Sequence, residues 1–142
     1  MQVQPYLFFD GRCEEALAFY GKALGAQVTV MMRYRDSPVP AQGGPEGCAP
    51  MPGDKIMHAN FQIGETQLMA SDGMAVGQAQ FKGFSLSIAA PDDAEARRIF
   101  EALAEGGQVQ MPLAATFFAS SFGMVADRFG VSWMVIVPLP MP

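Results

Sequence analysis

A weak internal repeat constrains the fold of this chain more than any other feature of its sequence. When the chain is shifted by 81 positions, Gly25 falls on Gly106, and Gln27-Val28 falls on Gln108-Val109. The same shift aligns three further pairs of residues: Glu14 with Glu95, Phe19 with Phe100, and Leu7 with Ile88. A repeat at a fixed spacing is typical of one supersecondary unit that occurs twice.

Each half contains one segment with the periodicity of an amphipathic helix. Between Cys13 and Leu24 apolar residues recur at helical spacing and form one stripe, and Gly25 supplies a stop signal. In the second half Asp92 precedes Glu95 by three residues, which is the spacing of a capping box. We therefore predict one helix over 13–24 and a second that follows Asp92 and ends at Gly106-Gly107.

Each predicted helix is preceded by one β-rich segment and followed by three. In the first half these segments cover residues 2–9, 27–35, 56–63 and 66–70. In the second half they cover residues 84–89, 108–112, 122–126 and 132–137. This order predicts an α+β fold made of two βαβββ modules, about 1–72 and 80–142, within a single domain over 1–142.

The composition narrows the cellular setting and the partners. With 50% hydrophobic and 16% charged residues, a chain of 142 residues is expected to fold without a disulfide or a metal. The net charge of -5 and the scattered basic residues exclude nucleic acid as an expected partner. No apolar run approaches the length of a membrane span, and residues 1–10 do not resemble a signal peptide. We expect a cytoplasmic protein with two free thiols, Cys13 and Cys48.

Residues 37–54 interrupt the first module with many prolines and glycines, which exclude regular structure. A loop of this length in a small domain is usually functional or disordered. Two interpretations stay open: a lid over a pocket, or a mobile insertion without a role.

Several motifs together resemble a known family. They are Pro5-Tyr6-Leu7, Phe9-Asp10-Gly11, Cys13-Glu14-Glu15-Ala16, Phe19-Tyr20, Leu24-Gly25, Ile56-Met57-His58-Ala59, and Asp127 to Val131 with Trp133. In combination they resemble the PhnB-like branch of the vicinal-oxygen-chelate (glyoxalase/bleomycin resistance/dioxygenase) superfamily. The resemblance implies a curled mixed sheet around a cavity, helices on the outer face, a homodimer, and a small molecule as partner.

Many sequences of this branch carry a demethylubiquinone methyltransferase-like label. The chain has no Gly-rich strand-to-helix turn of the kind that cradles a nucleotide cofactor, since Gly43-Gly44 lies in the Pro-rich loop. We therefore expect no cofactor.

The resemblance also implies where a metal ion would bind, because metal-dependent members use one side chain from each quarter of the sheet. Matching the motifs gives Gln4, His58, Ser85 and Met134 for these positions. Serine is a poor ligand, and the thioether of methionine is too soft for the hard divalent ions of the superfamily. We predict no native metal, with these four positions as vestiges of a site.

Strand alternation predicts which side chains share the face opposite the helices. His58, Asn60 and Gln62 fall on this face, and the same rule adds residues from the other strands. An ordinary explanation is that the face meets water, as antiparallel sheets allow. The family resemblance instead favours a ligand pocket, with a predicted lining of Gln4, Tyr6, Phe8, His58, Asn60, Gln62, Ser85, Ser87 and Met134.

His58 is the single histidine and the candidate acid–base group, although a hydrogen-bonded structural histidine explains it equally simply. Asp127 is expected to shape a turn, and Trp133 to lie in the core. The favoured function is a small-molecule binding protein of the glyoxalase/bleomycin-resistance type without a native metal. The alternatives are an enzyme that acts on a small oxygenated metabolite through His58, and a protein interaction module.

Overall fold

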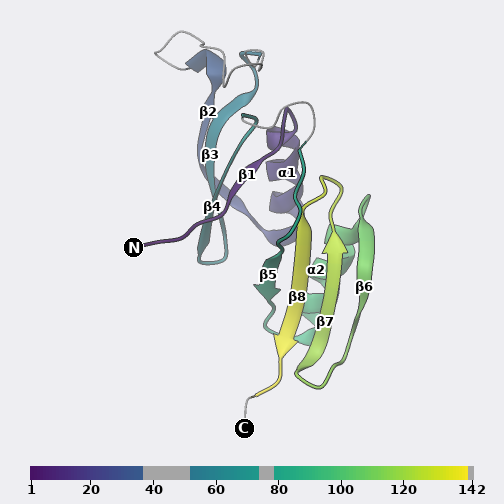
Figure 1. Ribbon diagram of the computed structural model, residues 1–142. Coiled ribbons are helices and arrows are strands. Elements are labelled where there is room, and N and C mark those ends of the chain that lie inside the picture. The colour runs from purple at the N-terminus through teal and green to yellow at the C-terminus, as the bar shows by residue number, and fades with distance from the viewer. Residues whose placement is uncertain (37–51, 74–78, 141–142) are drawn as a thin grey trace. The chain divides into compact units, whose positions relative to one another are not determined.

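The computed structural model describes residues 1–36, 52–73 and 79–140 of the chain (Figure 1). The chain divides into two compact units, Met1–Ala79 (the N-terminal unit) and Gln80–Pro142 (the C-terminal unit). The division falls between the two predicted modules, while the single domain over 1–142 stays a prediction. Most of the Pro- and Gly-rich segment 37–54 lies outside the described residues, and so does Cys48.

The N-terminal unit is a four-stranded mixed sheet with one long helix. Its elements in chain order are β1 (Tyr6–Phe8), α1 (Cys13–Leu24), β2 (Gln27–Arg33), a 3-10 helix (Tyr34–Asp36), β3 (Ile56–Ile63) and β4 (Thr66–Ser71). The strands lie in the order β1-β4-β3-β2. β1 runs parallel to β4, and the other neighbouring strands are antiparallel.

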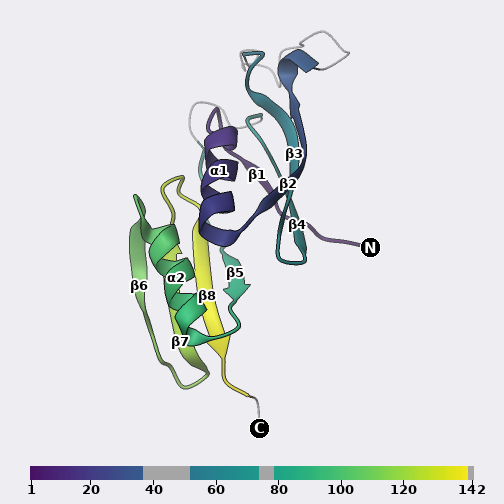
Figure 2. The ribbon, with the colours of Figure 1, turned by 180° about the vertical axis from the view of Figure 1, so that it is seen from behind.

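The C-terminal unit repeats this arrangement. Its elements are β5 (Leu86–Ala89), α2 (Asp93–Ala104), β6 (Gln108–Ala114), β7 (Ala119–Ala126) and β8 (Ser132–Pro138), with the strand order β5-β8-β7-β6. β5 runs parallel to β8, as β1 does to β4. In Figure 2 helix α2 lies in front of β7 and β8, whereas in Figure 1 it lies behind them. The helix therefore covers one face of the sheet and leaves the other open.

The α+β fold class and the βαβββ order are thus confirmed in both units. The described strands form two separate four-stranded sheets rather than one continuous sheet. The cavity enclosed by a curled sheet stays a prediction, as do the homodimer and the cytoplasmic location. No helix in the described part of the chain is long and apolar enough to cross a membrane.

One face of each sheet packs against the helix of its own unit. In the N-terminal unit the buried residues Leu7, Ala59 and Phe61 point to this side. Tyr20 of α1 stacks on Phe61 with ring centroids 6.3 Å apart and an interplanar angle of 13°. Because side chains alternate along a strand, their neighbours point to the opposite face, which we call the open face of each unit.

Proline explains two differences between the predicted and the observed strands. β1 begins at Tyr6 rather than at Gln2, because Pro5 has no N–H for the ladder and contributes its carbonyl alone, to Met69 N at 3.0 Å. β6 continues through Pro112 to Ala114, whereas the sequence predicted its end at 112. A proline is tolerated there because β6 is an edge strand.

Each unit is tied together by one buried aspartate. Asp72 accepts hydrogen bonds from the backbone N–H groups of Gly11, Cys13 and Ile56, each at 2.8 Å. Asp127 accepts from the N–H groups of Phe129 and Val131 and from Trp133 Nε1. The predicted structural role of Asp127 and the core position of Trp133 are therefore confirmed.

Cys13 is the first residue of α1 and is fully buried. Burial raises the pKa of its thiol, and the nearby carboxylates of Asp72 and Glu14 raise it further. Because the thiolate is the reactive form, this cysteine is chemically inert and packs as a small apolar residue. The expectation that it packs as a buried apolar residue is confirmed.

Candidate functional site

The open face of the N-terminal unit brings together most of the residues predicted for a ligand site. Tyr6 and Phe8 come from β1, and His58, Asn60 and Gln62 come from β3; all five are half-buried. On the same strands Leu7, Ala59 and Phe61 are buried on the helix side, so the predicted alternation holds over these residues.

The alternation ends at Met57, where the sequence predicted a side chain on the helix side. The register shifts between the pairs Met32–His58 and Arg33–Ile56, so Met57 is an extra residue in the ladder. Such a bulge reverses the facing of the residues beyond it. Ile56 is accordingly buried and Met57 is half-exposed.

His58 lies in a continuous hydrogen-bonded network on this face. Its Nδ1 is 3.0 Å from the hydroxyl of Tyr6, and its Nε2 is 2.7 Å from Asn60 Oδ1. Because Asn60 Oδ1 is an acceptor, Nε2 donates to it, and Nδ1 pairs with the hydroxyl of Tyr6. Both ring nitrogens therefore have a hydrogen-bond partner, and no carboxylate of the described residues is bonded to this network.

Aromatic rings surround the network. The ring centroid of Tyr6 lies 4.8 Å from that of Phe8 and 5.6 Å from that of His58. Tyr6 reaches His58 from β1 across the intervening strand β4, where Ser71 is small and buried. The result is a half-exposed surface with ring faces for stacking and polar atoms for hydrogen bonds.

Tyr34, which the sequence analysis missed, adds a hydroxyl near this surface. Burial raises the pKa of Tyr34, and Asp72 and Tyr6 raise it further. Its hydroxyl lies against Gly73, where an added Cβ would be 2.8 Å from Tyr34 Oη. No sequence signal pointed to it, because Tyr34 follows β2 in a 3-10 turn whose position depends on the tertiary structure.

Two other predicted residues of this unit lie outside the network. Gln4 precedes β1, and its amide nitrogen donates to Gln2 Oε1 at 3.1 Å. Gln62 lies on the open face further along β3, where its backbone pairs in register with Gln67 and Gln27. The hydrogen-bonded pair of Gln4 and Gln2 is exposed. The strand position predicted for Gln4 was wrong, because β1 begins only after Pro5.

The remaining predicted residues belong to the C-terminal unit. Ser85 lies just before β5, and its hydroxyl donates to Ser132 Oγ at 2.9 Å. Ser87 is exposed on β5 and pairs in register with Met134 of β8, which is half-buried. Phe84, predicted to pack under a helix, precedes the strand and is exposed. This unit therefore holds its own share of the predicted residues on its own open face.

Sheet register identifies residues that the sequence analysis missed. Tyr6 and Ser87 correspond by the repeat, and they pair with Met69 and Met134, respectively. Met69 is therefore the counterpart of Met134, whereas His58 lies on the neighbouring strand β3. The shift of 81 does not relate Met69 to Met134, because the long segment 37–54 lies between the two parts of the first module.

The residues at the four vestigial positions do not fit a hard divalent metal. Gln4 and Ser85 already have side-chain partners, and both nitrogens of His58 are engaged. Met134 offers a soft sulfur, and its counterpart Met69 offers another. In the part of the chain that the structure describes, no three His, Cys, Asp or Glu side chains gather as a metal-binding group.

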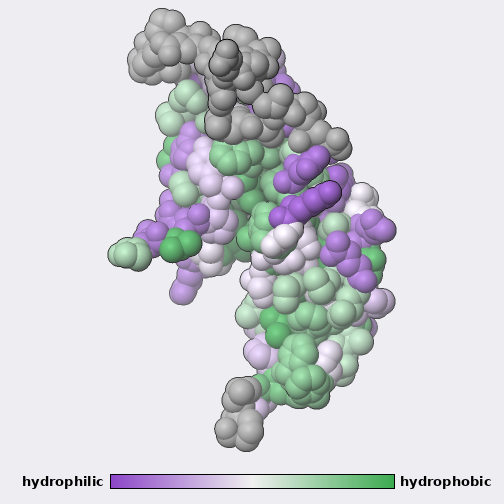
Figure 3. All heavy atoms as spheres, viewed as in Figure 1, coloured by the Kyte–Doolittle hydropathy of each residue, from purple (hydrophilic) through white to green (hydrophobic). Residues whose placement is uncertain are grey.

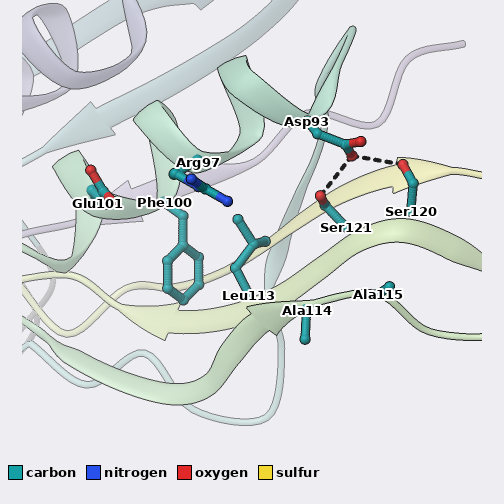
Figure 4. A pocket seen from close by; sticks show the side chains of 9 residues that line it. All are labelled: Asp93, Arg97, Phe100, Glu101, Leu113, Ala114, Ala115, Ser120 and Ser121. Atoms are coloured by element: carbon teal, nitrogen blue, oxygen red, sulfur yellow. Dashed lines mark hydrogen bonds between the residues drawn. The ribbon is translucent and has the colours of Figure 1, made fainter.

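A separate pocket of about 370 Å³ lies on the helix side of the C-terminal unit (Figure 4). It is lined by Asp93, Arg97, Phe100, Glu101, Leu113, Ala114, Ala115, Ser120 and Ser121. Asp93 accepts hydrogen bonds from the hydroxyls of Ser120 and Ser121, both at 2.7 Å, and these bonds lower its pKa. None of the predicted site residues lines it, and three of its polar groups already bind one another.

The model of the family described as 3-demethylubiquinone-9 3-methyltransferase matches residues 1–136 of this chain. The protein YjdN of Escherichia coli (strain K12) is 37% identical over 145 residues, which cover 100% of this chain and 99% of that protein.

Solved structures give the same picture. Protein PA1353 from Pseudomonas aeruginosa has a TM-score of 0.82 and 47% identity, and the match covers 97% of this chain and 98% of that one. A PhnB protein from Bacillus cereus, titled a 3-demethylubiquinone-9 3-methyltransferase, has a TM-score of 0.77 and 25% identity, with coverages of 96% and 99%. A glyoxalase-related enzyme from Fulvimarina pelagi (TM-score 0.61, 20% identity, coverages 96% and 88%) shares the fold.

Proposed function

This chain belongs to the 3-demethylubiquinone-9 3-methyltransferase-like (PhnB-like) family, and we propose that it binds a small uncharged molecule on the open face of its N-terminal unit. The fold of this family is also that of glyoxalase-related proteins. The observation that carries the proposal is the network in which His58 contacts Tyr6 Oη at 3.0 Å and Asn60 Oδ1 at 2.7 Å.

The charge of the surface selects the class of ligand. The open-face residues of β1, β3 and β4 around the network include no Asp, Glu, Lys or Arg: they are Tyr6, Phe8, His58, Asn60, Gln62, Gln67 and Met69. A charged ligand would lose hydration on such a surface without gaining an ion pair. A neutral ligand with an aromatic or conjugated body and one polar oxygen or amide would stack on Tyr6 and Phe8 and exchange hydrogen bonds with Asn60 and His58.

The family's name describes methyl transfer, and the helix starts of this chain give that chemistry no support. The N–H groups of Gly11 and Cys13 at the start of α1 donate to the carboxylate of Asp72. At the start of α2, Glu95 N donates to Asp92 Oδ1 at 2.8 Å. At each helix start a carboxylate of the chain therefore already accepts from N–H donors that a negatively charged group of a cofactor would otherwise use.

One observation favours a second candidate, an enzyme in which His58 is the acid–base group. The hydrogen bond between the hydroxyl of Tyr6 and Nδ1 joins two groups that can exchange protons. After a bound oxygenated metabolite displaces Asn60, the ring hydrogen would lie on Nδ1, where Tyr6 Oη accepts it. Nε2 would then take a proton from the metabolite, which leaves an imidazolium and the metabolite's anion. Binding alone requires only the hydrogen bonds, so we place binding first.

The binding proposal is tested with benzamide and phenol as uncharged probes and benzoate as the charged one. We expect benzamide and phenol to shift the imidazole NMR signals of His58 at millimolar concentrations, and benzoate to bind at least tenfold more weakly. Tyr6→Phe and His58→Ala should each weaken benzamide binding by about tenfold, which corresponds to about 1.4 kcal/mol. Gln4→Ala is the matched control, because its amide bonds to Gln2 outside the network.

Unchanged affinity in both Tyr6→Phe and His58→Ala would rule out the network as the binding site. Equal binding of benzoate would rule out the selection for neutral ligands. Deuterium exchange from a bound carbonyl compound that carries an α-hydrogen, lost in His58→Ala, would move the enzyme to first place.

A further inference from the structure

The C-terminal unit carries a row of methionines across its open face. Met111 of β6 pairs in register with Met124 of β7, which pairs with Met134 of β8. Ser87 of β5 completes the row beside Met134. Because neighbouring strands lie about 4.8 Å apart, the three thioethers form a strip roughly 10 Å long.

Polarity changes along the strands on either side of this row. In one direction lies an apolar row, two residues along β5, β7 and β8 and three along β6. In it Phe122 pairs with Ala114 and Ile136, and Ile136 pairs with Ala89. In the other direction lies a polar cluster. There Ser85 Oγ donates to Ser132 Oγ at 2.9 Å, and Ser132 Oγ donates to Gln110 Oε1 at 3.2 Å.

No side chain named in these rows and in the polar cluster is charged. Figure 3 views the strand side of this unit and shows hydrophobic residues gathered over much of it. A carboxylate or ammonium group seated here would be dehydrated without a counter-charge. A hydroxyl or amide group, in contrast, would match the half-buried hydroxyls of the serine cluster.

The shape of the row distinguishes an apolar ligand from a metal ion. Metal donors have to converge on one point, whereas these thioethers are spread over three strands. Methionine is flexible and polarisable, so a strip of it adapts to apolar groups of different outline. Met111 is 45% exposed, so the strip is accessible at its edge.

We propose that the open face of the C-terminal unit binds an uncharged amphiphile, with its apolar body along Met111, Met124 and Met134 and its polar head at Ser85, Ser132 and Gln110. The inference rests on the proposed function in one respect: it takes the open sheet face as a ligand surface. It adds the class of ligand that this part of the surface selects.

The test uses protein labelled with ¹³C at the methionine methyl groups and titrated with 1-octanol, octanoate and octylammonium. We expect 1-octanol to shift the methyl signals of Met111, Met124 and Met134 while that of Met69 stays in place. The two charged analogues should bind at least tenfold more weakly. Met124→Gln should weaken octanol binding by about tenfold, because it adds a polar group at the centre of the strip.

Met69→Gln is the matched control, because Met69 occupies the counterpart position in the N-terminal unit. If Met124→Gln does not fold, as reported by the fluorescence of Trp133, Met111→Gln at the exposed edge of the strip replaces it.

Three outcomes would overturn the inference: no octanol-induced shift at the three methionines, equal affinity for octanoate, or equal weakening by Met69→Gln. Stoichiometric binding of Ag(I) at these methyl groups without octanol binding would replace it with a thioether metal site. Benzamide binding at His58 is read from different signals, so the failure of either proposal is visible without the other.

Discussion

The two units build their sheets on the same frame but present different chemistry on their open faces. In the N-terminal unit the central row holds Val30, Asn60, Met69 and Tyr6, and in the C-terminal unit the corresponding row holds Met111, Met124, Met134 and Ser87. Val30 is 40% exposed and Met111 is 45% exposed, so the corresponding edges meet similar surroundings. One row contributes hydrogen bonds, and the other contributes polarisable sulfur.

The helix side keeps its apolar character in both units, although its residues differ in size. The corresponding positions are Ala59 and Gly123, Phe61 and Val125, Leu68 and Trp133, and Ala70 and Val135. All of these positions are buried. Residues on this side have to fill the space against a helix, whereas open-face residues do not pack against the helix of their unit. The packed faces of the two units therefore differ in the size of their apolar side chains, whereas the open faces differ in polarity.

The largest expected effect tests whether the two units are separate in stability. Asp72→Asn and Asp127→Asn each place an amide N–H₂ where backbone or indole N–H groups now donate to a carboxylate. Hydrogen bonds to a charged group contribute about 1.5–3 kcal/mol each, so each variant should lose about 3 kcal/mol of unfolding free energy.

Amide hydrogen exchange measures this loss in each unit. Asp72→Asn should reduce protection in β3 and leave β7 close to the wild type, and Asp127→Asn should do the reverse. Asp72 joins the β1–α1 turn to β3, while Asp127 binds residues within six positions of itself. An equal loss of exchange protection in both units from either variant would mean that the two units unfold together as one cooperative structure.

A medium effect is expected where the packed faces differ by one methyl group. In Gly123→Ala the new Cβ would lie 2.7 Å from Phe100 Cε2 and 3.0 Å from the backbone Cα of Leu113. Overpacking of this kind costs about 1–3 kcal/mol. The reverse change in the N-terminal unit, Ala59→Gly, loses one buried methyl group and costs about 1 kcal/mol.

Urea denaturation measures both variants, because the single tryptophan, Trp133, lies in the C-terminal unit and reports its unfolding. Far-UV circular dichroism follows the N-terminal unit as well. A Gly123→Ala variant as stable as the wild type would show that α2 shifts freely on its sheet, against the expectation that the packed face is the constrained one.

The sequence predicts the elements well where their periodicity is local. The stripe from Cys13 to Leu24 and the glycine after it predicted the bounds of α1, and the alternation in β3 predicted its open-face residues. Strand bounds near Pro5 and Pro112 were predicted poorly. The effect of a proline depends on whether another strand pairs with its own strand at that position. This pairing cannot be read from the sequence.

The site was predicted in part for a similar reason. Alternation placed Tyr6, His58 and Asn60 on one face, but the contact between Tyr6 and His58 depends on β4 lying between β1 and β3. The methionine row depends on the register of β6, β7 and β8, which non-local pairing and two shifts in β6 determine. Of the methionines in the row, the sequence analysis predicted Met134 alone.

The smallest expected effect concerns how each helix is attached to its sheet at its first turn. Glu14 of α1 forms an ion pair with Arg33 of β2, and Asp93 of α2 accepts from the hydroxyls of Ser120 and Ser121 of β7. A side-chain hydrogen bond from Arg33 lowers the pKa of Glu14, and hydrogen bonds from Ser120 and Ser121 lower the pKa of Asp93.

Because both folded-state pKa values lie below the unfolded ones, each contact contributes stability that is present above the unfolded pKa. This contribution is lost as the pH falls through the folded pKa, below about pH 4. The two attachments should nevertheless respond differently to salt. The ion pair of Glu14 is exposed and is screened, whereas the hydroxyl groups that bind Asp93 carry no charge.

Urea midpoints between pH 3 and pH 6, at low and at high salt, separate the two attachments. Glu14→Gln should flatten the acid limb by a small amount at low salt and have little effect in 1 M NaCl. The double variant Ser120→Ala/Ser121→Ala should flatten it equally at both salt concentrations, as read from Trp133. If high salt abolishes the effect of the serine variant as well, screened electrostatic interactions rather than the two hydroxyl hydrogen bonds stabilise the Asp93 contact. The two helices would then be attached in the same way.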